Sequence, residues 1–194
     1  MKNLLIVLQL LLLAGCQKET LTESSPLIPP TGFITYSILK GSHFSDKSSI
    51  KVFTGTGLSF NVKFDSSAIY QTIDPANQYD INKLCGFTEG NNNHINSARI
   101  GWSWNDGALR LYAYAYADGT RNTAEITSVA IGPVIHVSIG ITATEYVFTI
   151  DDKKVFLPRT VKDTVVNGYW QYPYFGGDEV APHHIYVHLK NLSN

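Results

Sequence analysis

The stretch SARIGWSWNDGALRLYAYAY, residues 97–116, decides the fold because it contains two alternating apolar and polar runs joined by Asp106-Gly107. Asp-Gly is the preferred dipeptide for a two-residue type I′ turn, in which both central residues have positive φ. Placing the turn there sets Asn105 opposite Ala108 and predicts an antiparallel hairpin of fixed register. In that register the facing pairs are Trp104 and Leu109, Trp102 and Leu111, Gly101 and Tyr112, Arg99 and Tyr114, and Ser97 and Tyr116.

Side chains alternate between the two faces of such a hairpin. One face is apolar, and we expect it to pack in a core; it carries Ala98, Ile100, Trp102, Trp104, Leu109, Leu111, Ala113 and Ala115. The opposite face is polar and aromatic; it carries Ser97, Arg99, Gly101, Ser103, Arg110, Tyr112, Tyr114 and Tyr116. A core would not select this second set, so we expect a binding platform. The alternative is a β-favouring surface stripe, or one packed under a loop.

Short β-rich runs separated by Gly, Asn, Asp and Ser clusters continue along the chain, at 33–39, 58–64, 125–131, 134–141, 145–150, 154–158 and 184–189. In 134–141 the alternation turns Ile135 and Val137 inward and leaves His136 outward, where we assign it to the binding surface. Only Asp74 to Leu84 indicates a helical turn, with Asp74 as cap and Pro75 at the first position. We therefore expect an all-β antiparallel β-sandwich, a jelly roll of the concanavalin A-like type, with at most a short helical turn.

The N-terminus predicts export. Lys2 precedes an apolar run, residues 4–13, that is too short to span a bilayer but suits a signal peptide. The run ends in Leu-Ala-Gly-Cys, which resembles a bacterial lipobox, so we expect a signal peptide over 1–15 and lipidation of Cys16. Residues 16–31 are rich in Ser, Thr and Pro and predict a flexible tether. Lys18-Glu19 resembles a surface-export signal, which indicates an outer-membrane lipoprotein at the cell surface, with the periplasmic face as the alternative.

The remaining residues, 32–194, are enough for one domain. The chain is 44% hydrophobic and 12% aromatic, which suffices for a core, and its net charge of −1 argues against a nucleic-acid partner. Once Cys16 is lipidated only Cys85 remains, so no disulfide can form within the chain, and a buried, unreactive thiol is the expected state. The oligomeric state is not indicated by the sequence.

Several short motifs resemble those of alginate- and glucuronan-type polysaccharide lyases. They are Lys83-Leu84-Cys85-Gly86-Phe87, Ser97-Ala98-Arg99, Tyr112-Ala113-Tyr114 and Tyr174-Phe175-Gly176-Gly177-Asp178, in the family's order over residues 58–190. That family consists of β-jelly rolls whose cleft is lined by the corresponding Lys, Arg and Tyr residues. Cys85 stands where the family pattern has proline. The whole chain also resembles a group of small bacterial surface lipoproteins, a likeness that implies no activity.

The resemblance implies a β-elimination that cleaves a uronate glycan. Such a reaction needs a cation on the uronate carboxylate, a base for the proton α to it, and an acid for the leaving oxygen. The expected catalytic residues are Arg99 for the carboxylate, Lys83 as base, and Tyr112 or Tyr114 as acid. We expect substrate contacts from Ser97, Arg110, Tyr116 and His136.

Three function classes stay open at this point: a lyase-like enzyme acting on an extracellular or dietary polysaccharide, a non-catalytic carbohydrate-binding module, and an adhesion lipoprotein with a protein partner. No cofactor is expected. Asp178, Glu179, His183, His184 and His188 do not have the spacing of a compact zinc motif, and no run of residues specifies a structural calcium ion. We therefore expect no metal site, and no membrane contact apart from the lipid.

Overall fold

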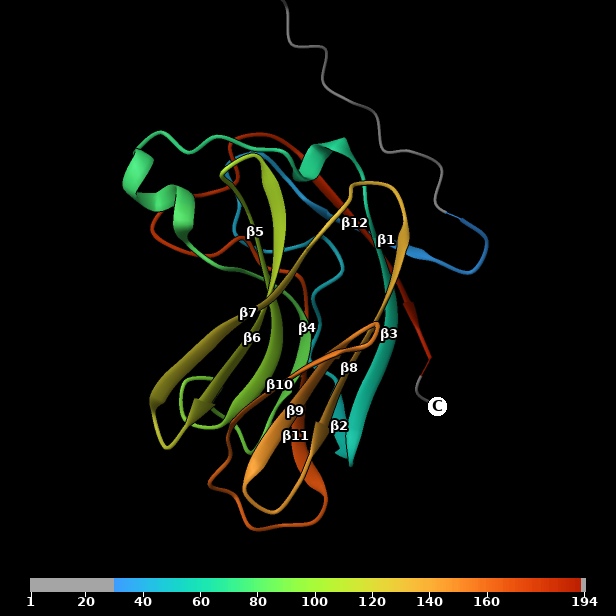
Figure 1. Ribbon diagram of the computed structural model, residues 1–194, viewed down its shortest axis with the longest axis vertical. Coiled ribbons are helices and arrows are strands. Elements are labelled where there is room, and N and C mark those ends of the chain that lie inside the picture. The colour runs from blue at the N-terminus through green and yellow to red at the C-terminus, as the bar shows by residue number, and fades with distance from the viewer. Residues whose placement is uncertain (1–29, 193–194) are drawn as a thin grey trace, which may run out of the picture.

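The computed structural model describes residues 30–192, so the predicted signal peptide, Cys16 and most of the tether lie outside the described residues. The chain forms two six-stranded antiparallel sheets (Figure 1). In the first sheet the strand order is β1 (Ile34–Ile38), β12 (Ile185–Asn191), β3 (Gly57–Phe64), β8 (Val134–Ile141), β9 (Glu145–Ile150) and β10 (Lys153–Pro158). In the second it is β2 (Val52–Gly55), β11 (Val166–Gln171), β4 (Asn82–Thr88), β5 (Ser97–Asn105), β6 (Ala108–Ala117) and β7 (Thr120–Val129).

The core lies between the two sheets, where their apolar faces meet. Phe64 of the first sheet packs on Trp102 of the second with ring centroids 5.5 Å apart, and Phe87 and Tyr146 make a similar contact at 6.3 Å. All four side chains are fully buried. The predicted all-β sandwich is therefore confirmed.

The predicted hairpin is confirmed in register and in the identity of its faces. Trp104 pairs with Leu109 and Arg99 with Tyr114, as the Asp-Gly turn requires. Asp106 and Gly107 have φ values of 49° and 72°, which fits a type I′ turn. The apolar face is buried in the core, with Trp104 at its edge. The polar and aromatic face turns away from the core, which makes it the outer face of the second sheet.

Strand β4 is the main element that the sequence did not predict. Its pairing with β5 shifts between Lys83 and Gly86, so a bulge interrupts the alternation that reveals a strand. Gly86 is required there, because a Cβ atom at this position would lie 2.0 Å from the carbonyl oxygen of Ala98. The glycine lets β4 lie close to the backbone of Arg99.

Two other strands were missed, whereas the helical turn predicted within residues 74–84 is confirmed. Strand β2 has four residues, and β11 contains Gly168 among aromatic residues. The helical segment is limited to the 3-10 helix η2 (Pro75–Tyr79), capped by Asp74 as expected. Leu84 belongs to β4 instead. A second 3-10 helix, η1 (Ser66–Ala68), lies at the same end of the sandwich as η2 (Figure 1).

A buried ion pair joins the two sheets. Arg159, directly after β10, donates from Nε and Nη2 to the two carboxylate oxygens of Glu89, directly after β4, at 2.7 Å each. Both side chains are almost completely buried, and Arg159 also donates to the carbonyl oxygens of Thr142 and Asp163. The pair is thus fully hydrogen-bonded, as a buried charge requires.

Cys85 is a structural residue. Cys85 lies in the core with 7% of its surface exposed, and burial raises the pKa of its thiol to about 12. Such a thiol is a poor nucleophile. Within residues 30–192 no helix is long and apolar enough to span a membrane.

Candidate functional site

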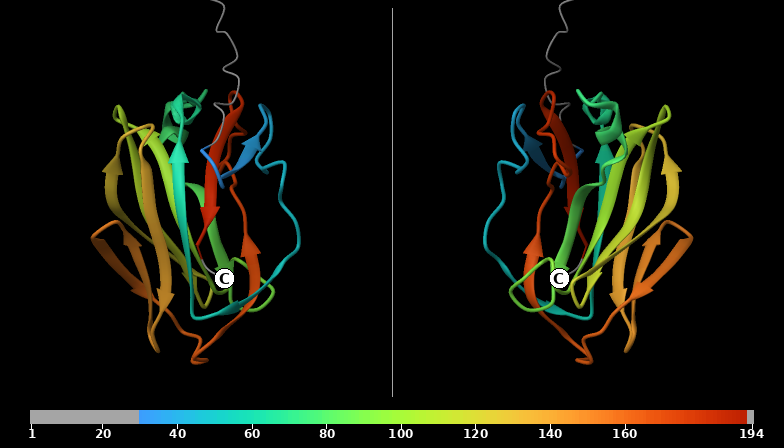
Figure 2. Two further views of the ribbon diagram at one scale, coloured as in Figure 1. Left: turned by 90° about the vertical axis from the view of Figure 1, so that its right-hand side faces the viewer. Right: turned by 90° about the vertical axis from the view of Figure 1, so that its left-hand side faces the viewer.

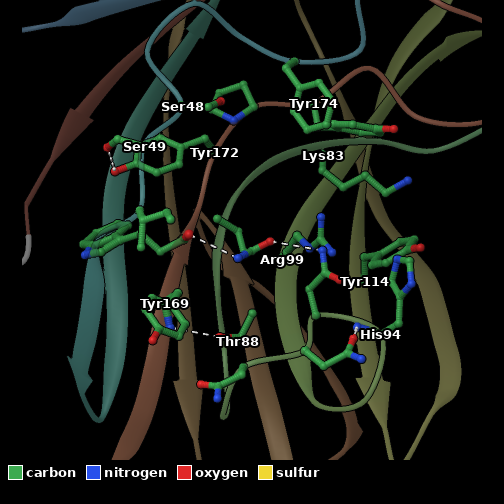
Figure 3. A pocket seen from close by; sticks show the side chains of 18 residues that line it. Ser48, Ser49, Lys83, Thr88, His94, Arg99, Tyr114, Tyr169, Tyr172 and Tyr174 are labelled. Carbon is green, nitrogen blue, oxygen red and sulfur yellow. Dashed lines mark hydrogen bonds between the residues drawn. The ribbon is translucent and has the colours of Figure 1, made fainter.

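A groove of about 790 Å³ lies on the outer face of the second sheet (Figure 3). This volume is within the range of roughly 300–1,000 Å³ that is usual for ligand sites. Its floor comes from β4, β5, β6 and β11, and its walls from residue 44 and from residues 48–50, 91–94 and 172–174. The first of these segments belongs to the long connection from β1 to β2, which runs down the outside of the molecule (Figure 2). We call this hollow the large groove.

Lys83 reaches the large groove from the bulged part of β4. Its backbone N–H and C=O both pair with Tyr174, which holds the segment after β11 against β4. Its ammonium lies 4.8 Å from the centroid of the Tyr114 ring and 5.9 Å from that of Tyr174. Burial, and next the charge of Arg99, lower the pKa of Lys83 to about 8, while Asp80 acts in the opposite direction.

Arg99 lies beside Lys83 in the floor (Figure 3). It is 6% exposed, and its guanidinium carbon is 5.9 Å from the Tyr114 centroid. Within residues 30–192 its Nε has no hydrogen-bond partner, and no carboxylate forms a salt bridge with it. Burial is the main cause that lowers its pKa, yet a guanidinium stays protonated at neutral pH. A buried cation of this kind is suited to receive an anion from solution.

Tyrosines surround the two cations. Tyr114 is 5% exposed, and its pKa is raised, mainly by burial and then by the neighbouring Tyr116 phenol. It therefore carries its proton at neutral pH. Tyr174 is positioned by a stacked contact with His43 and an edge contact with Phe44, with centroids 5.3 Å and 5.1 Å away.

The loop between β4 and β5 forms one wall. The buried Ser97 hydroxyl donates to the backbone carbonyl oxygen of Asn93 at 2.6 Å. The side-chain amide of Asn93 in turn donates to the amide oxygen of Gln171 at 3.4 Å. His94 packs on Tyr116 with centroids 5.2 Å apart. This wall offers amides, which are neutral donors and acceptors suited to sugar hydroxyls.

A smaller hollow of about 150 Å³ adjoins the large groove. Lys83 and Tyr114 line both hollows, so they stand at the junction. The rest of its lining includes Asp80 and Arg121, of opposite charge, with Tyr79 and Thr123. We call it the side pocket.

The structure brings together three of the predicted site residues, Lys83, Arg99 and Tyr114. Ser97 and Tyr116 lie just behind them, Ser97 as a support of the Asn93 loop and Tyr116 as the neighbour of His94 and Tyr114. Both residues therefore contact side chains or backbone that line the groove and do not line it themselves.

Three further predicted residues, Arg110, Tyr112 and His136, lie away from both hollows. Arg110 pairs with Glu125 at 3.0 Å, and the Tyr112 hydroxyl shares hydrogen bonds with Ser103 and Asn105. His136 lies on β8 of the other sheet, exposed on its outer face beside Asn61. The alternation that turned His136 outward was right, but outward on β8 is the opposite side of the sandwich, so this residue does not share the site.

Four aromatic residues of β11 and the segment after it also line the large groove: Tyr169, Trp170, Tyr172 and Tyr174. Phe175, the next aromatic residue, is core. The missed signal was β11 itself, because the alternation cannot be assigned to faces until the strand is recognised.

The histidines and acids near the C-terminus have separate partners. Glu179 accepts from the backbone of Ile73 and Asp74, the His183 ring contacts the Ser67 carbonyl at 2.8 Å, and His188 lies 3.5 Å from Asp65. Within residues 30–192, no three His, Cys, Asp or Glu side chains are grouped closely enough to hold a metal ion.

No protein-family model and no curated protein matches this sequence. Among solved structures the chain is similar to alginate lyase AlyC3, with 10% sequence identity, a TM-score of 0.51, and coverage of 83% of this chain and 89% of that chain. It is also similar to a family 7 alginate lyase in complex with product, at 11% identity, TM-score 0.49 and coverage of 81% and 77%. The laminarinase catalytic domain from Thermotoga maritima is similar with 11% sequence identity, a TM-score of 0.49, and coverage of 84% of this chain and 78% of that chain. At this identity the first likeness shows the fold, and the predicted resemblance to the jelly-roll fold of polysaccharide lyases is confirmed.

Proposed function

We propose that the large groove binds an acidic polysaccharide, with Lys83 and Arg99 receiving the carboxylate of one uronate unit. The observation that carries this proposal is the buried Arg99 guanidinium, which has a free Nε and no salt bridge with the described carboxylates. A buried cation without an ionic partner costs free energy, and a bound anion that pairs with it would lower this cost. The planar guanidinium fits a carboxylate through two parallel hydrogen bonds.

The aromatic walls support a sugar ligand. Tyr172 and Tyr174 line the groove together with the asparagines Asn91, Asn92 and Asn93. Aromatic rings stack on the apolar faces of sugars, while amides serve their hydroxyls. The fold is also one that a known alginate lyase uses.

We further propose that the bound uronate is cleaved by β-elimination. Neutral Lys83 takes the proton from the carbon α to the carboxylate, and Arg99 stabilises the charge that develops on the carboxylate oxygens. The electron pair left on that carbon forms a double bond to its neighbour as the bond to the glycosidic oxygen breaks. Tyr114 donates its proton to that oxygen, which leaves as the hydroxyl of the second fragment.

The test is to incubate the purified protein with uronate polymers and follow the ultraviolet absorbance of the new double bond. We expect Arg99→Ala, Lys83→Met and Tyr114→Phe to reduce the initial rate at least about a hundredfold, as removal of charge-stabilising or proton-transfer groups usually does. Arg110→Ala is the matched control, since Arg110 pairs with Glu125 outside both hollows. No absorbance change on any uronate polymer would contradict cleavage.

A non-catalytic carbohydrate-binding module is the second candidate. It is favoured by the lining itself, in which aromatic and amide side chains outnumber the cations. This candidate predicts binding without a rise in absorbance, and loss of binding in Arg99→Ala and Tyr174→Ala. Calorimetric titration with the same polymers separates the two functions.

We also propose that the protein acts outside the cytoplasm, attached by lipid on Cys16 to the outer membrane and facing the cell surface. The lipobox-like Leu-Ala-Gly-Cys at residues 13–16 and the Lys-Glu pair after it support this placement. Cys16→Ser should abolish incorporation of labelled palmitate. Protease treatment of intact cells should remove the domain if it faces outward and spare it if it faces the periplasm.

A further inference from the structure

We propose that the polysaccharide is a mixed one, in which single uronates are separated by neutral sugars, and not an uninterrupted polyuronate. The proposal rests on the proposed function and specifies its substrate class. It comes from how charge is distributed along the two hollows.

The large groove has one centre of positive charge. Among the described residues that line it, Lys83 and Arg99 are the only Lys or Arg side chains, and both lie in contact with Tyr114. None of the Asp and Glu residues between 30 and 192 lines it. The rest of the lining is aromatic, amide, hydroxyl or aliphatic, apart from His94. A polyuronate filling this groove would place further carboxylates against neutral walls, each losing hydration without gaining a cation.

The side pocket does not supply a second carboxylate site either. It begins at the same Lys83, and its other cation, Arg121, is exposed and shares the pocket with Asp80. The carboxylate of Asp80 acts on the ammonium of Lys83 and offsets part of the positive potential. A second uronate next to the first would meet Asp80, and like charges at short range repel.

The walls beyond the central cations suit neutral sugars. Beyond Lys83 and Arg99 the lining includes Tyr169, Trp170, Gln171 and Tyr172 of β11 and the segment after it, and the three asparagines of the β4–β5 loop. Lys51, which directly follows the lining residue Ile50, lies 4.8 Å from the Trp170 centroid and already makes a cation–π contact there. The chain of sugars is therefore recognised by stacking and hydrogen bonds, with one ionic contact point at Lys83 and Arg99.

The experiment is calorimetric titration of the protein at pH 6.5 with three polymers: polymannuronate, deacylated gellan, in which single glucuronates are separated by neutral sugars, and the neutral glucan laminarin. We expect gellan to bind at least about tenfold more tightly than polymannuronate and laminarin to bind more weakly than gellan. Raising the salt from 50 to 500 mM should weaken gellan binding only a few fold, because one carboxylate is paired in a largely buried place.

Asp80→Asn tests the origin of the preference. Removing this carboxylate should raise the affinity for polymannuronate about threefold or more while changing that for gellan less. Asp152→Asn, an exposed acid in the β9–β10 turn of the other sheet, is the matched control and should change neither.

Tighter binding of polymannuronate than gellan by the wild-type protein would overturn the mixed-polymer inference and leave the proposed function intact. Equal affinities for polymannuronate in the wild type and Asp80→Asn would overturn it as well. Failure of all three polymers to bind would instead contradict the proposed function and with it this inference.

Discussion

The ammonium of Lys83 lies 4.8 Å from the centre of the Tyr114 ring, and the guanidinium of Arg99 lies 5.9 Å from the same ring. Two cations thus share one aromatic partner in a largely buried place. A cation–π contact contributes about 0.5–2 kcal/mol. That does not offset the burial of two like charges, so the free protein carries an unfavourable arrangement that a bound anion would relieve.

Replacing Lys83 should stabilise the protein. The folded-state pKa is about 8 and the ordinary value is 10.5, so the unfolded chain binds more protons between these values. Stability therefore falls as pH drops from about 10.5 through 8 and stays low below that. At pH 7 we expect Lys83→Met to raise the free energy of unfolding by about 2 kcal/mol, measured by urea denaturation. The stabilisation by Lys83→Met should be smaller at pH 10.5. If Lys83→Met were less stable than the wild type at pH 7, the buried charge of Lys83 would not be destabilising.

The pH dependence separates cleavage from binding. Neutral Lys83 is the proposed base, so kcat/KM should rise with pH and reach half its plateau near pH 8. Charged Lys83 helps hold the carboxylate, so affinity for a uronate polymer should fall over the same range. Initial rates and calorimetric affinities from pH 6 to 9 give both curves. A rate that falls as pH rises through 8 would exclude Lys83 as the base.

The Arg159–Glu89 ion pair should be essential for stability. Arg159→Met leaves the Glu89 carboxylate buried without its partner, which usually costs about 3–5 kcal/mol. The double variant Arg159→Met, Glu89→Leu should recover much of this loss, because it removes the stranded charge. Arg110→Met breaks an exposed pair and serves as the control with a much smaller effect. An equal loss of unfolding free energy in Arg159→Met and Arg110→Met would show that burial of the Arg159–Glu89 pair does not matter.

Acid should destabilise the fold partly through His188. Its pKa is lowered below the ordinary value of 6.5, mainly by burial, while Asp65 opposes this and Lys63 adds to it. The unfolded chain therefore takes up a proton first as pH falls below 6.5, and stability decreases until the folded-state pKa is passed. The free energy of unfolding should change less steeply between pH 6.5 and 5 in His188→Gln than in the wild type. If the unfolding free energies of His188→Gln and the wild type changed equally with pH, protonation of His188 would not contribute to acid destabilisation.

Gly86→Ala should damage both the fold and the groove. A Cβ atom there would lie 2.0 Å from the Ala98 carbonyl oxygen and 2.7 Å from the Arg99 Cα atom, so β4 and β5 must separate. We expect a loss of about 2–4 kcal/mol of stability, as for other overpacked sites, and weaker polymer binding. Gly140→Ala is the control, because a Cβ atom at Gly140 has nothing within 4 Å. A Gly86→Ala protein of normal stability would show that the strands can adjust.

The sequence predicted the fold wherever alternation and turn chemistry agreed. The β5–β6 hairpin is correct in every pair because Asp106-Gly107 allows only one register, and the bounds of β8 and β9 are as predicted. Strand β4 was missed because a bulge interrupts its alternation at Lys83 to Gly86. Nothing in the local sequence shows that a strand with such an interruption pairs with β5 on one side and β11 on the other.

The site was predictable to the same extent. Arg99 and Tyr114 were placed together by the hairpin register, while Lys83 joined them through the family resemblance alone. His136 was misplaced because alternation tells which side chains face outward but not which sheet they belong to. The aromatic wall from β11 depends on pairings between residues about eighty positions apart, such as Trp170 with Phe87, which no local pattern specifies.

Alternate residues of β5 and β6 serve the core and the groove, so the two cannot be altered independently. A single-residue insertion early in β5 would turn Ile100 and Trp102 toward solvent and Arg99 into the apolar interior. We therefore expect changes of ligand preference to arise in the segments that border the floor, at residues 44, 48–50, 91–94 and 172–174. These segments do not alternate between the core and the groove as β5 and β6 do. Libraries meant to redirect the protein to another polymer should vary those segments and leave the strands unchanged.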